Sequence, residues 1–263
     1  MKPGPCASGL FLARTIAVVN QKGGVGKTTT AVNLSAALAV AEKRTLLVDV
    51  DPQSNATRGL GFASDVERAS VYDCLLEGVN GRLPLLQTEI PFLTLLPSER
   101  DLLGVELELV GADARERRLR AVLDQVRGDY DFILLDCPPS LGLLTLNALV
   151  ASDALLVPVQ CEYLALEGLS EVLATWERVA ATLNPGLALE GVLLTMFDDR
   201  TNLCRQVVVE IRGHLGAQVF KTVIPRNIRL GEAPSFGKPI LTYDIRSKGA
   251  EAYMQLAREI IEK

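Results

Sequence analysis

Histidine is rare in this sequence, and closely spaced cysteines are missing. The chain has 263 residues and one histidine, His214, which lies in a helix-like stretch among charged residues. Any general base must therefore be a carboxylate or a bound phosphate. The five cysteines form no C-x-x-C pair, which argues against a zinc or iron–sulfur site and predicts reduced thiols in the core. They are Cys6, Cys74, Cys137, Cys161 and Cys204.

Long apolar runs are also missing. No stretch approaches the length of a membrane span, and the apolar centre of residues 1–14 is too short for a signal peptide. A chain of this length that is 48 % hydrophobic can bury one large core. We therefore expect a cytoplasmic protein with a disordered tail over residues 1–13 and a single domain over residues 14–263.

Short apolar runs alternate with helix-like segments. Continuous β-branched or leucine-rich runs are typical of strands that are buried on both faces. Expected strands are 15–19, 45–48, 92–96, 132–135, 155–159, 192–196 and 219–224. Expected helices are 29–41, 116–126, 143–151, 165–183, 203–214 and 249–261, and residues 78–91 are expected to form a loop. This order predicts an α/β fold, a doubly wound and mainly parallel sheet with helices on both faces.

The most informative segment joins the first expected strand to the first expected helix. It reads KGGVGKTT, from Lys22 to Thr29. Its glycines allow backbone N–H groups to turn toward a phosphate, while Lys27 can reach the β- and γ-phosphates and the Thr28 hydroxyl can bind Mg²⁺. The sequence therefore predicts a nucleoside triphosphate site that uses Lys22, Gly23, Gly24, Val25, Gly26, Lys27, Thr28 and Thr29.

Carboxylates follow two other expected strands. Asp49 and Asp51 lie at i and i+2 after the second strand, so both point to the same side of an extended segment. Such a pair can hold a metal-bound water and orient an attacking one. Asp136 ends a further apolar strand, where it is expected to contact Mg²⁺ through water. We predict Thr28, Asp49 and Asp136 at the metal, and Lys22, Lys27 and Asp51 in catalysis.

The phosphate loop departs from the standard pattern, because Gln21 stands where a glycine is usual and Lys22 adds a second lysine. This variant resembles the deviant Walker A loop of the ParA/MinD family. The resemblance extends over nearly the whole chain from Arg14 onward, through 158–160, 195–201 and 224–235, and is closest to ParA/Soj partitioning ATPases. It implies an ATP-dependent homodimer in which Lys22 reaches the partner's phosphates and Asp51 supports attack by water. It also implies that Pro225 and Asn227 frame the adenine.

Charge is unevenly distributed along the chain. The formal net charge is −5, yet residues 195–248 contain nine basic and five acidic side chains. The resemblance implies that Arg200 and Arg229 in this segment belong to a surface that holds DNA without sequence preference in the ATP-bound dimer. It further implies a nucleoid-associated protein that is stimulated by a ParB-like adaptor.

Three alternatives have different sequence requirements. A MinD-like membrane-associated division ATPase would need a basic amphipathic terminal helix, whereas residues 251–263 carry more acidic than basic side chains, so we expect no membrane partner. A nitrogenase-reductase-like protein would need cysteine ligands for a cluster, which the cysteine pattern does not support. A small-molecule kinase would need an acceptor pocket that the sequence does not identify.

Overall fold

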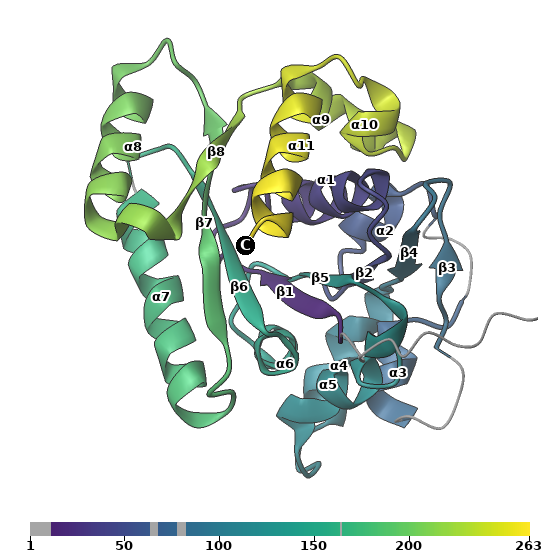
Figure 1. Cartoon of the computed structure of the whole chain (residues 1–263). Helices are drawn as coiled ribbons and strands as arrows, with labels where there is room; N and C mark the ends of the chain where they lie inside the picture. The colour runs from purple at the N-terminus through teal and green to yellow at the C-terminus, as the bar shows by residue number, and fades with distance from the viewer. Residues whose placement is uncertain (1–11, 64–67, 78–82, 164) are drawn as a thin grey trace, which may run out of the picture.

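A central sheet of eight strands organises the chain in this computed structural model (Figure 1), which describes residues 12–63, 68–77, 83–163 and 165–263. The strand order is β3-β4-β2-β5-β1-β6-β7-β8, and every neighbouring pair is parallel except β3 and β4. The strands are β1 (Arg14–Val18), β2 (Thr45–Asp49), β3 (Leu86–Gln87), β4 (Leu93–Leu96), β5 (Phe132–Asp136), β6 (Ala154–Gln160), β7 (Ala188–Phe197) and β8 (Val219–Pro225).

Helices cover both faces of the sheet. The α-helices are α1 (Lys27–Val40), α2 (Asn55–Gly59), α3 (Val71–Glu77), α4 (Val105–Glu108), α5 (Arg118–Leu123), α6 (Leu143–Ala151), α7 (Ala165–Thr182), α8 (Asn202–Leu215), α9 (Ile228–Glu232), α10 (Ile240–Tyr243) and α11 (Lys248–Ile261). Short 3₁₀ helices are η1 (Arg100–Gly104), η2 (Arg115–Arg117), η3 (Arg127–Asp129), η4 (Gly216–Gln218) and η5 (Ala233–Phe236). No helix in the described ranges is long and apolar enough to cross a membrane.

Side-chain alternation along each strand divides the core into two layers. On β1, Ile16 and Val18 pack with the layer of α1 and α11, while Ala17 packs with the layer of α5 to α8. Figure 1 shows α1 and α11 on one side of the strands and α5, α6 and α7 on the other. Both faces of the sheet are therefore buried under helices, which accounts for the continuous apolar runs in the sequence.

The predicted fold class is confirmed, and all seven predicted strands are present. The sequence did not predict β3, which lies within residues 78–91. The expectation that this whole segment forms a loop was therefore wrong at the strand. This strand has two residues, too few for any hydrophobic period. The expected tail falls outside the described residues except at its end, where Ala13 is buried and its N–H donates to the Arg127 carbonyl at 2.9 Å.

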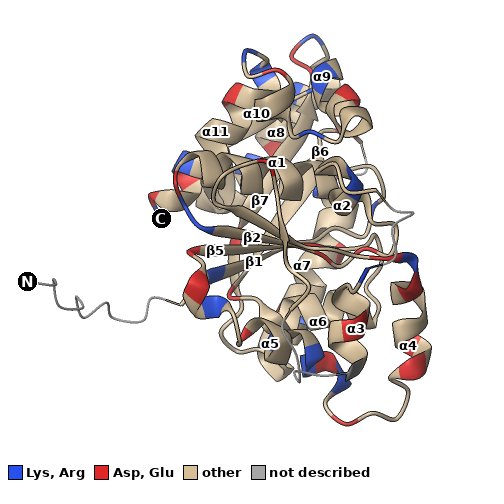
Figure 2. Ribbon diagram, turned by 90° about the vertical axis from the view of Figure 1, so that its right-hand side faces the viewer, with Lys and Arg blue, Asp and Glu red and all other residues tan. Residues whose placement is uncertain are grey.

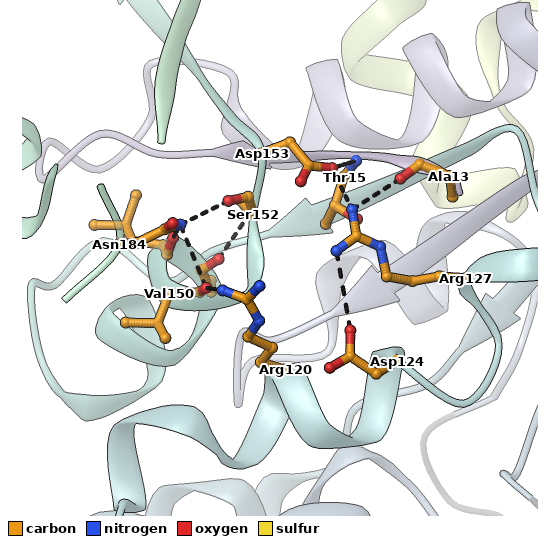
Figure 3. Close-up of polar contacts among 11 residues, drawn as sticks. Ala13, Thr15, Arg120, Asp124, Arg127, Val150, Ser152, Asp153 and Asn184 are labelled. Carbon is orange, nitrogen blue, oxygen red and sulfur yellow. Dashed lines mark hydrogen bonds and ion pairs between the residues drawn. The ribbon is translucent and has the colours of Figure 1, made fainter. Parts of the chain in front are cut away.

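Polar groups tie the elements together at the amino ends of β1 and β6. Arg127 lies at the centre of this cluster, with a guanidinium N–H 2.5 Å from Asp153 and a second bond, 3.1 Å long, to the Ala13 carbonyl. Asp153 also accepts from the Thr15 N–H, and Asn184 donates to three carbonyls at the end of α6 (Figure 3). We define this group as the amino-edge cluster.

Candidate functional site

The loop between β1 and α1 is fixed by the neighbouring strands. The Asn20 amide donates to the Pro158 carbonyl on β6 at 2.7 Å, and its oxygen accepts from the Lys22 N–H at 3.0 Å. From β7, the Thr195 hydroxyl donates to the Val25 carbonyl at 2.8 Å. Because β1, β6 and β7 all end at this edge, their last residues hold the loop above the carboxyl ends of the strands, where ligands bind in sheets of this type.

Two glycines give the loop its shape. Gly24 has φ +75° and Gly26 has φ +91°. Residues other than glycine rarely adopt this left-handed backbone conformation. Gly26 leads directly into α1, which has 14 residues and begins at Lys27. The free N–H groups and the positive end of the helix dipole therefore face the loop, as in a site for phosphate.

The two lysines of the loop lie in different surroundings. Lys27 is 7 % exposed, and its Nζ donates to the Lys22 carbonyl across the loop at 2.9 Å. Burial lowers the Lys27 pKa, and the nearby Asp136 carboxylate opposes that shift. The Lys22 side chain runs instead along α7, where a Cβ added to Gly168 would lie 3.0 Å from its Cε. Lys27 thus points into the loop while Lys22 packs on a neighbouring helix.

Two buried carboxylates lie side by side at the ends of neighbouring strands below the loop. Asp49 ends β2 and Asp136 ends β5, and the two are paired in register. Asp49 accepts from the N–H and the hydroxyl of Thr57 at 2.8 and 2.7 Å. Neither Asp136 oxygen lies within hydrogen-bond distance of a partner in the described structure, although the Thr28 hydroxyl is near enough to lower its pKa. A buried carboxylate without a partner is costly, so this one is suited to a cation.

Burial acts on both groups, and repulsion from the Asp49 charge adds to it at Asp136. Burial, and next to it the Asp49 charge, raises the Asp136 pKa well above its usual value, while Thr28 and Lys27 act in the opposite direction. Burial raises the Asp49 pKa to about 6 against the hydrogen bonds from Thr57. Among the described residues there is no group of three or more side chains of the metal-ligating types. Mg²⁺ is usually held by one or two carboxylates together with phosphates and water, and Asp136 and Asp49 are carboxylates placed at this edge.

Asp51 lies near this pair on the segment after β2. It is 5 % exposed, and its Oδ1 accepts from the Gln53 N–H at 2.9 Å. The Ser98 hydroxyl donates to the Asp51 carbonyl at 2.8 Å and links the segment to the end of β4. The side chain therefore has a fixed orientation at the same sheet edge as Asp136.

A cavity of about 180 Å³ opens beside the phosphate loop. Its lining includes Gly26, Thr29, Pro225 and Asn227, so the two residues expected at the adenine lie next to the loop. The Asn227 side chain also accepts from the Arg229 N–H at 2.8 Å and begins α9. The cavity is largely apolar in character, as a base-binding site requires.

Sequence reasoning assigned no role to four residues of this region: Asn20, Thr195, Met196 and Tyr253. Met196 lines the cavity with φ +51°, a strained conformation for a side chain of this size. Tyr253, on α11, lines it too, and its hydroxyl lies 3.2 Å from that of Thr30 on α1. The position of Asn20 directly after an apolar strand could have indicated a role in the loop. The sequence around Tyr253 contains no such indication, because α11 meets the loop only in the folded chain.

The two arginines expected at DNA lie after adjacent strands. Arg200 follows β7 and is 82 % exposed, with a guanidinium that donates to both Asp198 oxygens at 2.8 and 2.6 Å. Arg229, on α9, donates to Glu232 at 2.8 Å. Phe197 and Pro225 are paired in register, so both arginines lie beyond the same edge of the sheet. Figure 2 shows basic and acidic segments mixed around α9 and α10.

Comparisons with known proteins decide the family. A model of the AAA domain family matches residues 13–189. ParA, the chromosome partitioning protein of Myxococcus xanthus, is 55 % identical over 96 % of this chain and 89 % of its own length. The sporulation initiation inhibitor protein Soj of Bacillus subtilis is 55 % identical over 95 % of this chain and 98 % of its own length. The chain belongs to the ParA/Soj family of chromosome-partitioning ATPases.

Solved structures share the fold of this ParA/Soj chain. A cobyrinic acid a,c-diamide synthase from Mycobacterium smegmatis with bound ADP and magnesium has a TM-score of 0.84 and 39 % identity, covering 95 % of each chain. MinD from Pyrococcus horikoshii, in complex with Mg-ADP, has a TM-score of 0.76 and 28 % identity, covering 95 % of this chain and 96 % of its own. The predicted P-loop NTPase fold is confirmed, and the MinD likeness is the more distant one.

Proposed function

We propose that this chain is an ATP-dependent DNA-partitioning switch of the cytoplasm and nucleoid. ATP brings two copies together face to face, and the dimer binds double-stranded DNA without sequence preference. Hydrolysis, stimulated by a ParB-like adaptor, then releases the DNA. The single observation that carries this proposal is the two-lysine loop KGGVGKTT placed above Asp49, Asp51 and Asp136 at one sheet edge of a ParA/Soj chain.

ATP and Mg²⁺ are the ligands that fit the loop. Backbone N–H groups from Gly23 to Thr29 and the Lys27 ammonium hold the phosphates, because the loop places them at the start of α1. The Thr28 hydroxyl and the unpartnered Asp136 carboxylate hold the metal, with Asp49 supporting from β2. When bound, Mg²⁺ neutralises charge on the phosphate oxygens. Pro225 and Asn227 frame the adenine in the adjoining cavity.

Hydrolysis and dimerisation use two further residues. Asp51 orients the attacking water, since its carboxylate is held in place by the Gln53 N–H near the metal site. Lys22 leaves α7 in the dimer and reaches the phosphates of the partner subunit. This assignment is supported by the position of Lys22 at the opening of the loop, where Lys27 already supplies the internal cation.

DNA binding uses arginines that are already paired with acids. Arg200 and Arg229 donate to carboxylates at the surface, and exposed ion pairs of this kind contribute little to stability. A DNA phosphate can therefore replace the carboxylate at small cost. Two copies would double the number of cations on one surface, so a monomer with a net charge of −5 would bind DNA more weakly than the dimer.

The test is DNA affinity with Mg-ADP and with a non-hydrolysable ATP analogue across a range of salt. We expect tight binding with the analogue alone, on any sequence, with a log–log salt slope of about −0.9 per phosphate contacted. The double variant Arg200→Ala/Arg229→Ala should flatten this slope by roughly one unit for each phosphate that it leaves without a cation. Arg44→Ala is the matched control, because Arg44 is also exposed and paired with an acid. Equal affinity with both nucleotides would contradict the proposal.

A MinD-like role at a membrane is less well supported. The MinD likeness would favour it, yet α11 buries its apolar face through Ala250, Tyr253, Leu256 and Ile260. A helix packed in this way has no apolar face left to insert into a lipid surface. Sedimentation with anionic lipid vesicles and the ATP analogue separates the two roles: this proposal expects the protein to stay in the supernatant.

A further inference from the structure

A buried asparagine joins the helix that follows the phosphate loop to a short helix next to it. Asn33 lies on α1 and is 4 % exposed. Its amide N–H donates to the Thr29 carbonyl at 2.7 Å, and its amide oxygen accepts from the Ile240 N–H at 2.7 Å. Thr29 belongs to the first turn of α1, and Ile240 is the first residue of α10, which lies next to α1 (Figure 1). One amide group therefore fixes the start of α10 relative to the first turn of α1.

Further contacts lead from α10 to Arg229. Tyr243 is the last residue of α10, and its hydroxyl donates to Glu232 Oε2 at 3.1 Å. The same oxygen accepts from the Arg229 guanidinium at 2.8 Å. Because α10 is a single helical turn of four residues, a shift of Ile240 also shifts Tyr243. The ion pair of Arg229 is thus connected to the first turn of α1 through hydrogen bonds and one short helix.

A second contact reaches the same segment from the side of Asp51. Gly237 follows η5 with φ +63°, and a Cβ at this position would lie 2.6 Å from the Gly61 Cα. Only glycine therefore fits this approach of two backbones without a shift. Gly61 follows α2, and the residue before α2, Ser54, donates its N–H to the Asp51 carbonyl at 2.9 Å. The segment 233–243 is thus in contact both with the helix of the phosphate loop and with the helix that follows Asp51.

A cavity lies between these elements. It has a volume of about 420 Å³, and its lining includes Asn33 on α1, Arg58 on α2 and Pro234 on η5. Side chains in a close-packed core have no space in which to move, whereas a segment that borders a cavity can shift into it. The segment 233–243 therefore has contacts that define its position and a space in which that position can change.

Arg200 has no comparable connection in the described part of the chain. The hydrogen bonds of its guanidinium and of its N–H, and its ion pair, all go to Asp198 two residues earlier. That pair lies within the loop after β7. The two arginines proposed at DNA therefore differ, since the Arg200 pair is local and the Arg229 pair is connected to the phosphate loop.

We propose that Asn33 and Tyr243 are positioning residues through which a nucleotide in the phosphate loop sets the position of Arg229. Bound phosphate fixes the first turn of α1, Asn33 holds the start of α10 against that turn, and Tyr243 holds the carboxylate that pairs with Arg229. Arg229 thus depends on the nucleotide within one subunit, in addition to any pairing of two subunits. The consequence for DNA rests on the proposed function, whereas the connection from α1 to α10 does not.

The first experiment needs neither DNA nor hydrolysis. Hydrogen exchange of the Ile240 amide is measured without nucleotide, with Mg-ADP and with a magnesium complex of a non-hydrolysable ATP analogue. Either nucleotide should slow exchange at Ile240 at least about fivefold more than at the Leu187 amide, because a fixed first turn holds the Asn33 oxygen in place. Leu187 is the reference for a general gain in stability, since its N–H donates to the Asn184 carbonyl in the amino-edge cluster.

Two variants of Asn33 separate its two hydrogen bonds. Asn33→Ser keeps a donor for the Thr29 carbonyl but is too short to reach Ile240. Asn33→Asp keeps an acceptor for Ile240 but has no donor for Thr29. Both variants should lose the extra slowing at Ile240, because the connection needs both bonds. Ser35→Ala is the matched control and should keep it, since Ser35 is another buried polar residue of α1.

The second experiment measures the ratio of DNA affinity with the analogue to DNA affinity with Mg-ADP. Tyr243→Phe removes one hydroxyl and keeps the ring, which lies 5.1 Å from the Phe236 ring. We expect the ratio to fall at least about threefold, because Glu232 is no longer bonded to α10, while affinity for the analogue stays within about threefold of the parent value. Tyr72→Phe is the matched control and should leave the ratio unchanged, since the Tyr72 hydroxyl also donates to a glutamate, Glu108.

Each contrary result has a defined meaning. An Ile240 amide that responds to nucleotide in the Asn33 variants as it does in the parent overturns the role of Asn33. An unchanged ratio in Tyr243→Phe, or a lower ratio that sedimentation traces to loss of an analogue-induced dimer, overturns the role of Tyr243. If the parent binds no DNA with either nucleotide, the proposed function fails, and the exchange experiment still decides whether α1 and α10 are connected.

Discussion

The two edges of the same sheet bury charged groups in opposite ways. At the amino edge, Arg127 meets Asp153 and the Ala13 carbonyl, so its charge is compensated within the protein (Figure 3). At the carboxyl edge, Asp49 and Asp136 lie side by side on neighbouring strands, and neither Asp136 oxygen lies within hydrogen-bond distance of a partner in the described structure. The ammonium of the nearby Lys27 donates a hydrogen bond to the Lys22 carbonyl in the loop.

This difference separates stability from function. A compensated buried charge holds elements together, and removing one member leaves the other without a partner. A buried carboxylate without a partner destabilises the free protein and gains stabilisation only when a cation arrives. Among the described residues, Asp136 is a buried carboxylate with neither a hydrogen bond nor an ion pair, and it lies at the edge with the phosphate loop, whereas Glu190 near the amino edge is ion-paired with Arg14 and Lys263. The comparison predicts that substitutions at the carboxyl edge change nucleotide binding and hydrolysis, and that substitutions at the amino edge change the free energy of unfolding.

The largest effect is expected for Lys27→Ala. Nucleotide binding should be lost, because the substitution removes the cation that pairs with the β- and γ-phosphates. The fold should persist, since the Lys27 ammonium donates to a loop carbonyl and not to a core element. Isothermal titration with Mg-ATP and circular dichroism test both statements, with Lys22→Ala as the control that should still bind. Nucleotide affinity close to that of the parent would remove Lys27 from the site.

Asp51→Ala should bind Mg-ATP and hydrolyse it about 10² to 10⁴ times more slowly, because the group proposed to position water is lost. Single-turnover hydrolysis of bound ATP isolates this step from product release. An unchanged rate would assign the role to another residue, and Asp49→Ala would be the next variant to measure.

Substitutions at the amino edge should change the stability of the protein and leave nucleotide binding unchanged. Arg127→Met should lower the free energy of unfolding by about 2 kcal/mol, because it removes the cation paired with Asp153, which keeps only the Thr15 N–H, and the donor to the Ala13 carbonyl. Arg44→Met, at an exposed pair with Asp131, should cost less than about 1 kcal/mol. Urea unfolding without nucleotide gives both values. A loss of ATP affinity in Arg127→Met with unchanged stability would break the comparison.

The smallest expected effect is on the stability of Asp136→Asn in the absence of ligand. An uncharged amide costs less to bury than an unpartnered carboxylate, so the free energy of unfolding should stay the same or rise by up to about 1 kcal/mol. Mg²⁺-dependent hydrolysis should fall sharply in the same variant. A destabilisation as large as that expected for Arg127→Met would mean that Asp136 has a structural role.

Much of the fold and part of the site follow from local sequence. The strand at 132–136 was predictable from its apolar run, and the loop at 22–29 from its glycines and lysines, because each signal lies within one segment. The amino-edge cluster was not predictable, since Arg127 precedes β5 and Asp153 precedes β6, and the two meet because both strands pair with β1. Asn184 donates across more than thirty residues for the same reason. Contacts that depend on topology leave no periodic pattern in the sequence.

The role of Lys22 and the pairing of two subunits are tested most directly by sedimentation velocity with Mg-ADP and with a magnesium complex of a non-hydrolysable ATP analogue. The carboxyl edge is proposed to be complete only when two loops enclose two nucleotides. The parent should therefore be a monomer with ADP and a dimer with the analogue, and Lys22→Ala should remain a monomer with either while still binding nucleotide. One and the same mass for the parent with both nucleotides, or an analogue-induced dimer of Lys22→Ala equal to that of the parent, would contradict the proposed switch.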